Sequence, residues 1–305
     1  AFLDVFSLKV VSCRSITYVF SKTIAPVLTV EPGEEVVFET LDARGGRAMD
    51  PEEKYAPPPP KPVERTNPAT GPVFIDGAKP SDALVVEVQR IALGCWGYVS
   101  ARPTIGVLKD QVKNPFARAI GVKDGVVQFS EDLQFPARPM IGTIGVAPPA
   151  RDIPTFYPGP HGGNMDCNDV SPGSKLYLPV YVDGALFALG DVHASMGDGE
   201  TSGGGLDISS DTTVKLGLIK GWAPRVPIIE TPTNIVIVYN AGNLQDAVRG
   251  VVAEMVRLLS SKLGMAVEEA IALVSTAGDV RICQACEGPV DVVVRLQMPK
   301  LFELP

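Results

Sequence analysis

The stretch KLYLPVYVDGALFALGD, residues 175–191, decides the fold class because it holds two apolar, β-prone runs with a turn signal between them. The runs are residues 176–182 and 186–191, and Asp183-Gly184 is the kind of pair that closes a two-residue hairpin. We therefore expect a hairpin of two short strands here. The polar residues on either side of it should lie at the strand ends.

Both histidines of the chain and a dense group of carboxylates flank this pair of strands. PGPHGGNMDCNDV (158–170) comes before it and VHASMGDGETSGGGLD (192–207) comes after it. Histidine nitrogens and carboxylate oxygens in such density suit a divalent metal, zinc above all, and the glycines let a small ligand approach the backbone. In Asp191-x-His193 both side chains would share one face of a strand. The candidates are His161, Asn164, Asp166, Asp191, His193, Asp198 and Glu200.

Strand and turn signals continue through most of the chain. IAPVLTVEPGEEVVFETLDA (24–43) predicts two strands around a Pro-Gly turn, and ALVVEVQRIAL (83–93) predicts a half-buried strand. Residues 94–108 read as a loop, whose Trp96 and Tyr98 could wall a pocket or pack in the core. Residues 44–72 are rich in proline, glycine and charge, which predicts a surface loop with a polyproline-II run at Pro57–Pro60.

Helix signals come only near the end of the sequence. An i, i+3, i+4 apolar pattern predicts a helix over residues 246–263 that Gly264 ends, and a second helix over 267–275. VRICQA and VDVVVRLQM then predict two closing strands. We expect a mainly β fold: a jelly-roll-like β-sandwich body over residues 1–245 that carries the site, and a C-terminal α/β segment over 246–305 packed on it.

Composition excludes several classes of protein. The chain has 305 residues, 45% hydrophobic and 20% charged, with a net charge of −8. The negative charge argues against nucleic acid and anionic membranes as partners, and no apolar run reaches transmembrane length. Five cysteines, an odd number over a long chain, fit a reduced protein better than a disulfide framework. We expect a cytoplasmic protein.

Three segments together resemble the acetamidase/formamidase family of metal-associated amide hydrolases. They are TGPVFIDGAKPSDAL (70–84), HGGNMD (161–166) and LPVYVDGALFALGDVHASMGDGE (178–200), and the likeness runs from about Val27 to Glu303. The resemblance implies hydrolysis of small neutral amides such as formamide or acetamide. It also implies a divalent ion, zinc before calcium, held by a set drawn from Asp42, Asp166, His193 and Glu200.

The resemblance also implies how the remaining site residues would act. Glu200 or Asp191 would accept the proton of the attacking water and deliver it to the leaving ammonia, and His161 is a further catalytic candidate. Asn164 and the backbone N–H groups around Gly163 would bind the substrate oxygen. The opening residues 1–26 lack the histidine and tryptophan that the family often shows. Asp207 stands where we expect a longer glutamate.

Other chemistries are less well supported by the residues. Cys167 next to Asp166 could be a nucleophile, but successive residues of an extended segment point in opposite directions, so a buried inert thiol fits better. Cys283-x-x-Cys286 lacks a second pair of cysteines and fits packing. The alternative to an enzyme is a β-sandwich binding protein with a structural calcium site, although calcium prefers oxygen ligands to histidine. A homo-oligomer, dimer or tetramer, is expected, and the proline-rich loop is one place where subunits could meet.

Overall fold

The structure is a computed structural model that describes residues 8–46, 65–286 and 290–305. The predicted polyproline run at Pro57–Pro60 lies outside these ranges. The elements in chain order are β1 (Lys9–Val11), β2 (Ile16–Thr17), β3 (Val19–Phe20), β4 (Leu28–Val30), β5 (Glu35–Thr40), β6 (Ala69–Ile75), β7 (Ala83–Ala101), η3 (Lys109–Gln111), β8 (Phe116–Lys123), β9 (Val126–Gln128), β10 (Gln134–Pro136), β11 (Met140–Gly145), β12 (Ile153–Pro154), β13 (Pro158–Gly159), β14 (Gly162–Asn164), β15 (Lys175–Pro179), β16 (Phe187–His193), β17 (Asp207–Ile219), β18 (Ile228–Glu230), β19 (Asn234–Ala241), α1 (Leu244–Leu263), α2 (Val267–Ala277), β20 (Asp279–Gln284) and β21 (Val292–Pro299).

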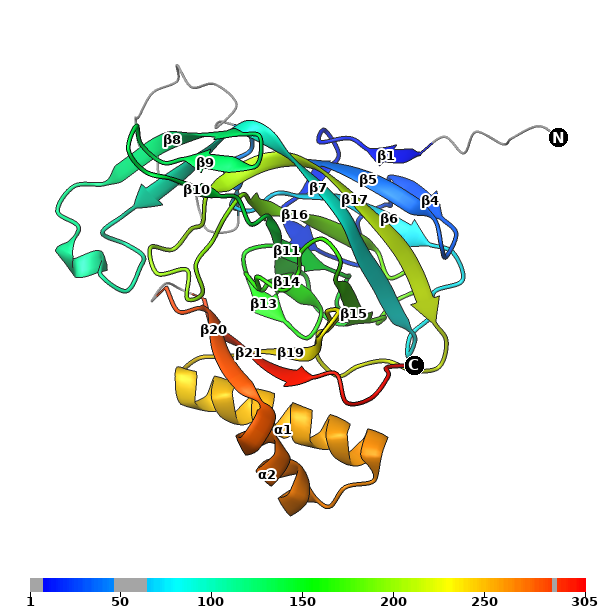
Figure 1. The fold of residues 1–305 in the computed structure, drawn as a ribbon. Coiled ribbons are helices and arrows are strands. Elements are labelled where there is room, and N and C mark those ends of the chain that lie inside the picture. Colours follow the sequence, from blue (N-terminus) through cyan, green and yellow to red (C-terminus); the bar gives the residue numbers. More distant parts are fainter. Residues whose placement is uncertain (1–7, 47–64, 287–289) are drawn as a thin grey trace.

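A curled sheet forms the body, and the two helices lie together on one side of it, beneath β19, β20 and β21 in the view of Figure 1. Within the described residues, 19 strands join one hydrogen-bonded sheet, while β3 and β12 pair with each other. The prediction of a mainly β fold with C-terminal helices is confirmed. The jelly-roll-like sandwich arrangement stays a prediction.

The expected hairpin of residues 176–191 is wrong. β15 pairs with β7 and β18, whereas β16 pairs with β11, β6 and β17. Three successive residues between them, Gly184, Ala185 and Leu186, have left-handed backbones with φ of 73°, 57° and 56°. A two-residue hairpin turn has only two such positions, so the chain turns further and the two strands separate.

Strand β7 is much longer than predicted. It runs 19 residues, through the segment that reads as a loop, and pairs with β17 along nearly all of its length. The glycines that suggest a loop are needed for close strand approach: a Cβ at Gly97 would lie 2.6 Å from the Asp207 carbonyl oxygen, and one at Gly94 would lie 2.7 Å from Ser209 Oγ. Glycine here serves packing between strands instead of ending one.

The prediction of a surface loop over residues 44–72 is wrong at its C-terminal end. Residues 67–73 are buried, and β6 pairs with β16, β2 and β4. Gly71 has φ of 131° and a Cβ there would lie 2.9 Å from the Phe187 carbonyl oxygen, so this glycine also permits a close crossing of two strands.

The C-terminal segment agrees with its sequence signals. Asn243 caps α1, since its Oδ1 accepts a hydrogen bond of 2.9 Å from Asp246 N–H, and Gly264 ends the helix with φ of 68°. The buried face of α1, including Val251 and Met255, packs on β19 and β21. No helix in the described part of the chain combines the length and apolar character needed to cross a bilayer.

Strands join the two parts that we predicted on either side of residue 245. β19 belongs to the first part by sequence, yet it pairs with β21 along eight positions, while β18 links it back to β15. One hydrophobic cluster fills the curled sheet, and a second lies between the helices and β19 and β21 and also takes in Val85 and Tyr177 of the body. The C-terminal segment is therefore built into the sheet.

Candidate active site

Strand β16 supplies the centre of the site. It carries Asp191 and His193 at its end, where β11 lies on one side and β17 on the other. In this register His193 stands opposite Asp207, the first residue of β17. Asp166 arrives from the loop after β14, which pairs with β11. Strands β11, β16 and β17 and the loop after β14 thus meet at the end of β16 that carries His193.

Asp166, Asp191 and His193 form a buried cluster in which one ligand atom of each lies within 4.8 Å of the others. His193 Nε2 is 3.5 Å from Asp191 Oδ1 and 3.2 Å from Asp207 Oδ1. The expectation that Asp191 and His193 approach each other is confirmed. Plain strand alternation is not the whole reason, because Asp191 has a left-handed backbone with φ of 52°.

Neutral side chains hold this cluster in place. Asn67 Nδ2 lies within hydrogen-bond distance of two acceptors, Asp191 Oδ2 at 2.6 Å and Asn164 Oδ1 at 2.8 Å. Thr143 Oγ1 lies 2.8 Å from the same Asn164 oxygen and 3.3 Å from Asp191 Oδ2. Because the Asn164 side-chain oxygen already accepts these hydrogen bonds, the N–H₂ group of Asn164 is the part that can donate to a substrate.

Two glycines leave the space that the cluster occupies. A Cβ at Gly142 would lie 2.6 Å from Asp166 Oδ1 and 2.8 Å from the Asp191 carbonyl oxygen. A Cβ at Gly205 would lie 2.7 Å from His193 Nδ1. These positions tolerate no side chain unless a site residue moves.

Burial and mutual repulsion dominate the electrostatics of the cluster. Burial, and then the Asp191 carboxylate, raise the pKa of Asp166 to about 7. Burial raises the pKa of Asp207 to about 6. The pKa of Glu200 is also raised well above its usual value, first by burial and then by Asp166. Burial alone would lower the pKa of His193, but the surrounding carboxylates raise it well above its ordinary value.

This donor set fits a divalent cation. Both Asp166 oxygens are buried without a hydrogen-bond partner among the described residues, and the neighbouring carboxylates repel one another. Buried polar atoms without partners are rare in folded proteins, and a cation supplies both the missing partner and the missing charge. One imidazole nitrogen with carboxylate oxygens is a ligand set that zinc accepts.

Glu200 reaches the site from a strained loop. Its backbone is left-handed with φ of 44°, as is that of Asp166 with φ of 46°. Backbone strain of this kind in non-glycine residues costs about 1–3 kcal/mol each and clusters at functional sites. The loop is held by β20, since Gly199 N–H donates to the Cys283 carbonyl and Ala285 N–H donates to the Gly199 carbonyl. The C-terminal segment therefore fixes the position of Glu200.

Asp191 and His193 of the cluster line a cavity of about 580 Å³. The polar lining residues Asn164, Asp191, His193, Glu200 and Asp207, termed the floor, share the cavity with residues termed the wall, which include Tyr98, Ile105, Phe116 and Phe156. The sequence-based suggestion that Tyr98 walls a pocket is confirmed, while Trp96 is 40% exposed on the surface. A concave site with few polar groups on an apolar wall is typical of small-molecule binding.

A family model for acetamidases and formamidases matches residues 16–157 and 149–303. The chain belongs to this family. Its similarity to solved structures covers nearly its whole length. The acetamidase from Bacillus halodurans is 34% identical with a TM-score of 0.91 over 95% of this chain and 97% of that one. The acetamidase from Yersinia enterocolitica is 30% identical with a TM-score of 0.85 over 96% and 92% of the two chains.

Among curated relatives, a protein of Schizosaccharomyces pombe named as a formamidase is 27% identical over 251 residues. That alignment covers 63% of this chain and 61% of the relative, so the chain spans less than two thirds of the relative's length. Membership of the acetamidase/formamidase family agrees with the resemblance seen in the sequence.

Not all of the predicted metal ligands belong to the cluster of Asp166, Asp191 and His193. The group of three holds neither Asp42 nor Glu200, although Glu200 lines the cavity. Asp42 is fully buried, and its Oδ1 accepts a hydrogen bond of 2.8 Å from Arg44 N–H. Its carboxylate contributes to the raised pKa of Asp207, which places it on the edge of the same charge cluster. The role of Asp42 as a ligand stays a prediction.

His161 and Gly163 are not among the residues that line the cavity. His161 is buried with its ring edge-on to Phe20 at 5.2 Å, and burial lowers its pKa to about 4. Neither ring nitrogen has a hydrogen-bond partner among the described residues. Gly163 has φ of 81°, and a Cβ there would lie 2.1 Å from the Tyr157 carbonyl oxygen, so its backbone conformation requires glycine. The catalytic and substrate-binding roles of these two residues stay predictions.

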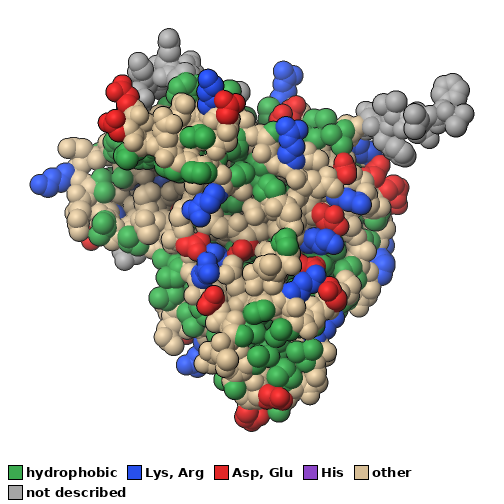
Figure 2. Space-filling view, viewed as in Figure 1, with side chains coloured by type: hydrophobic (Ala, Val, Ile, Leu, Met, Phe, Trp, Pro, Cys, Tyr) green, Lys and Arg blue, Asp and Glu red, His purple; other side chains and the backbone are tan. Residues whose placement is uncertain are grey.

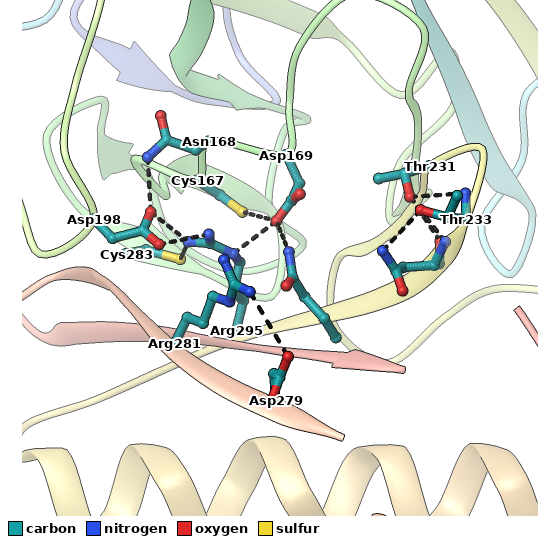
Figure 3. A network of polar contacts seen from close by, with 12 residues as sticks. Cys167, Asn168, Asp169, Asp198, Thr231, Thr233, Asp279, Arg281, Cys283 and Arg295 are labelled. Carbon is teal, nitrogen blue, oxygen red and sulfur yellow. Dashed lines mark hydrogen bonds and ion pairs between the residues drawn. The ribbon is translucent and has the colours of Figure 1, made fainter. Parts of the chain in front are cut away.

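The remaining candidates are Cys167, Asp198 and the cysteine pair Cys283 and Cys286, none of which belongs to the cluster. Cys167 is fully buried, as predicted, and burial raises its pKa well above the usual value; that the thiol is inert stays a prediction. Asp198 is not part of the cluster of three and pairs with Arg295 (Figure 3). Cys283 and Cys286 are buried and form no disulfide within the described residues, and Cys286 also lines the cavity.

Sequence motifs do not identify four residues of the site as functional. Asp207 stood out only as a departure from the family pattern, yet it lies 3.2 Å from His193. Asn67 follows the proline-rich segment and Thr143 sits in an apolar strand, where nothing in the local sequence marks them. Gln284 Nε2 donates to the Asn164 carbonyl oxygen at 2.7 Å across 120 residues of sequence. Only the pairing of distant strands brings these side chains together.

Proposed function

We propose that this protein hydrolyses a carboxylic amide to the carboxylate and ammonia, with a divalent metal, zinc, held by Asp166, Asp191 and His193. The single observation that supports the proposal is the buried cluster itself. Several carboxylates face one histidine on the floor of a cavity, and both Asp166 oxygens lie without partners among the described residues. Such a cluster is costly to maintain unless a cation completes it.

When bound, a divalent ion supplies Lewis acidity, which polarises an amide carbonyl and acidifies water. The chain's own residues supply the remaining parts. The Asn164 N–H₂ group donates to the carbonyl oxygen as negative charge develops on it. Asp207, whose Oδ1 lies 3.2 Å from His193 Nε2 as an ion-pair contact, helps to orient the imidazole.

Glu200 moves the proton in this mechanism. Burial and then Asp166 raise its pKa well above its usual value, which makes this carboxylate a stronger base than an ordinary glutamate. Water oxygen forms a bond to the carbonyl carbon while Glu200 takes the water proton. As the C–N bond breaks, Glu200 gives that proton to the departing nitrogen, and ammonia leaves.

The test begins with elemental analysis of purified protein and ammonia release from formamide and acetamide, before and after treatment with a chelator. We expect about one zinc per chain and ammonia release that the chelator abolishes and added zinc restores. Glu200→Gln should retain zinc and lose turnover, whereas His193→Ala should lose both. Asp132→Asn, at an exposed loop carboxylate, is the matched control and should match the parent protein.

A binding protein with a structural calcium ion is the competing proposal, and the same experiment decides between them. Calcium in the site with no ammonia from any amide would overturn the amidase. The histidine nitrogen in the cluster favours zinc, since calcium binding sites are built from oxygen ligands.

We also propose a cytoplasmic homo-oligomer, a dimer or a tetramer. Figure 2 shows hydrophobic side chains gathered over the two helices, and Leu263, Val267 and Ile271 there are 42%, 55% and 49% exposed. A contiguous apolar surface of this kind supports contact with another subunit. All five cysteines are free thiols, which supports a reducing compartment. Light scattering coupled to size-exclusion chromatography measures the subunit number directly.

A further inference from the structure

The cavity is far larger than formamide or acetamide requires. Its volume of about 580 Å³ falls within the range of about 300–1,000 Å³ that is typical of pockets for drug-sized ligands. A water molecule takes up about 30 Å³ of liquid water, and acetamide, with only a few non-hydrogen atoms, takes up a small multiple of that. Most of the space would stay unfilled by a short amide.

The cavity lining contains both polar and apolar residues. Its polar residues include Asn164, Asp191, His193, Glu200 and Asp207, and the Tyr98 hydroxyl is hydrogen-bonded to Asp207. Its apolar residues include Ile105, Pro115, Phe116 and Phe156. Phe116, at the start of β8, is 47% exposed and stands at the surface of the molecule. A lining of polar and apolar residues matches a molecule with one polar and one apolar end.

The charges around the cavity favour a neutral substrate. Arg44 lies over the Tyr98 ring with its guanidinium carbon 4.4 Å from the ring centre, and an Arg102 N–H donates to the Gly203 carbonyl at 3.2 Å. Three carboxylates of the floor offset these two cations. The lining therefore has no excess of positive charge that would select an anion.

We propose that the substrate is a neutral primary amide whose acyl group carries a bulky apolar body, an aryl ring or a branched alkyl chain. The amide group lies on the polar floor and the apolar body lies against Phe116 and Ile105. This inference rests on the proposed amidase activity and adds the substrate class to it.

The test compares ammonia release from formamide, acetamide and phenylacetamide by the zinc-loaded protein. We expect kcat/KM for phenylacetamide to exceed that for acetamide by about 10- to 100-fold, because apolar surface buried in a pocket contributes to transition-state binding. Turnover of acetamide with no gain for phenylacetamide would overturn the substrate class and leave the amidase intact. Ammonia from none of the three would overturn the amidase itself.

A variant pair locates the apolar end. Phe116→Ala should lower the ratio of kcat/KM for phenylacetamide to that for acetamide by about fivefold or more, since it removes a large part of the wall. Leu133→Ala is the control: Leu133 is 58% exposed in the neighbouring β9–β10 connection and does not line the cavity. The ratio should be the same in this control as in the parent. Equal ratios in all three proteins would show that the apolar body does not lie against Phe116.

A separate observation concerns Arg295, in the middle of β21. Its side chain is only 3% exposed, and its NH1 and NH2 groups donate to Asp198 Oδ1 at 3.0 Å and Oδ2 at 2.8 Å. Its Nε forms an ion pair with Asp169 Oδ2 at 2.7 Å (Figure 3). One guanidinium thus joins two loops. Asp169 is three residues after Asp166, and Asp198 is two residues before Glu200.

Further contacts tie the same loops together. Gln297 Nε2 donates to Asp169 Oδ2 at 2.8 Å, and Asn168 Nδ2 donates to Asp198 Oδ1 at 2.7 Å. The backbones at Asp166 and Glu200 are left-handed, so both loops need external support to keep their conformations. We infer that Arg295 is a positioning residue that sets the separation between the metal-binding loop at Asp166 and the proton-transfer residue Glu200.

The first variant replaces the whole network by neutral groups: Arg295→Met together with Asp169→Asn and Asp198→Asn. It removes the guanidinium without leaving buried carboxylates unpaired, so the fold should persist. We expect kcat to fall about 10- to 100-fold with KM changed less than threefold, and zinc affinity of the metal-stripped protein, titrated with zinc chloride, to fall by a similar factor. A purely structural role would lower the melting temperature and leave kcat of the folded protein unchanged.

Two single variants complete this test. Arg295→Lys keeps the charge but loses the two parallel hydrogen bonds, and its kcat should lie between those of the parent and the triple variant. Arg257→Met is the control, since Arg257 on helix α1 is 42% exposed and pairs with Glu254 of the same helix at 2.7 Å, away from both loops. Parental kcat and zinc affinity in both Arg295→Lys and the folded triple variant would overturn the positioning role.

Discussion

Asp166 and Asp169 stand three residues apart in the sequence, and they belong to two carboxylate clusters of opposite character. Around Asp169 the chain supplies its own cation, since Arg295 pairs with both Asp169 and Asp198. Burial alone would raise the pKa of Asp198, but hydrogen bonds from Arg295 and Asn168 lower it. Around Asp166 no arginine or lysine forms an ion pair within the described residues, and the pKa of Asp166 is raised.

The difference separates a structural cluster from a site. Where a cluster is neutralised by the chain, it holds loops together and offers nothing to a ligand. Where the charge is left unbalanced, folding places a strained group of donors ready for a cation from solution. Substitutions in and around the two carboxylate clusters test this difference.

The largest effect is expected from Asp166→Asn. Because this change removes a proposed metal ligand from the unbalanced cluster, ammonia release should fall by about 10³-fold or more. Asp198→Asn, in the balanced cluster, should reduce it by no more than about tenfold, in line with a support role. Steady-state assays on both variants, with zinc content measured in parallel, check the contrast. Equal losses in the two variants would contradict it.

The same substitution should stabilise the metal-free protein, and the gain should depend on pH. Asp166 has a higher pKa in the folded than in the unfolded state, so the parent loses stability as pH rises from about 4 to about 7. The free energy of unfolding of Asp166→Asn should match that of the parent near pH 4 and exceed it by a few kcal/mol above pH 7, since one pKa unit corresponds to about 1.4 kcal/mol. Urea unfolding in chelator measures this gap, and a gap that shrinks as pH rises would refute the charge imbalance.

His161 should show the opposite pH dependence. Burial lowers its pKa to about 4, so the unfolded chain binds the proton more tightly and the protein loses roughly 3 kcal/mol as pH falls from about 6.5 to about 4. His161→Leu removes that loss, because the new side chain has no proton to take up. Unfolding curves across this range should be flatter for the variant. If they keep the parental slope, His161 is not the buried neutral imidazole described here.

A smaller effect is expected from Gly142→Ala. The added methyl would lie 2.6 Å from Asp166 Oδ1, so the carboxylate must shift and zinc affinity should fall about 10- to 100-fold. Gly217→Ala is the matched control in a strand, where the nearest atom to a Cβ would be Val85 Cβ at an ordinary 3.5 Å. Zinc titration of both variants checks the difference, and equal affinities would mean that the cluster relaxes without cost.

The sequence predicts those features that depend on local pattern. The two C-terminal helices and the mainly β body follow from periodicity over a few residues, and the approach of Asp191 to His193 follows from it only in part, because Asp191 has a left-handed backbone. The hairpin at Asp183-Gly184 fails because Ala185 and Leu186 adopt left-handed backbones that no local signal announces. Gly94 and Gly97 suggest a loop because glycine ends strands more often than it permits two strands to approach.

The site is predicted only as far as one stretch of sequence carries it. His193, Asp166 and Glu200 lie within 40 residues of one another, and the density of histidines and carboxylates in that stretch indicates a site. Asn67 and Gln284 lie more than 90 residues from Asn164 and reach it only through the sheet. Their hydrogen bonds depend on strand register, which the spacing of polar residues does not encode.

The bond from Gln284 to the Asn164 carbonyl has a consequence for synthesis of the protein. The two residues are 120 positions apart, and at about 5–20 residues per second a ribosome needs roughly 6–24 s to travel from one to the other. Asp166, Asp191 and Glu200 are all made early in that interval, while the strand that supports their loops is still missing. A nascent chain therefore exposes these carboxylates to water for most of the interval, and the site reaches its final geometry only after β20 is made.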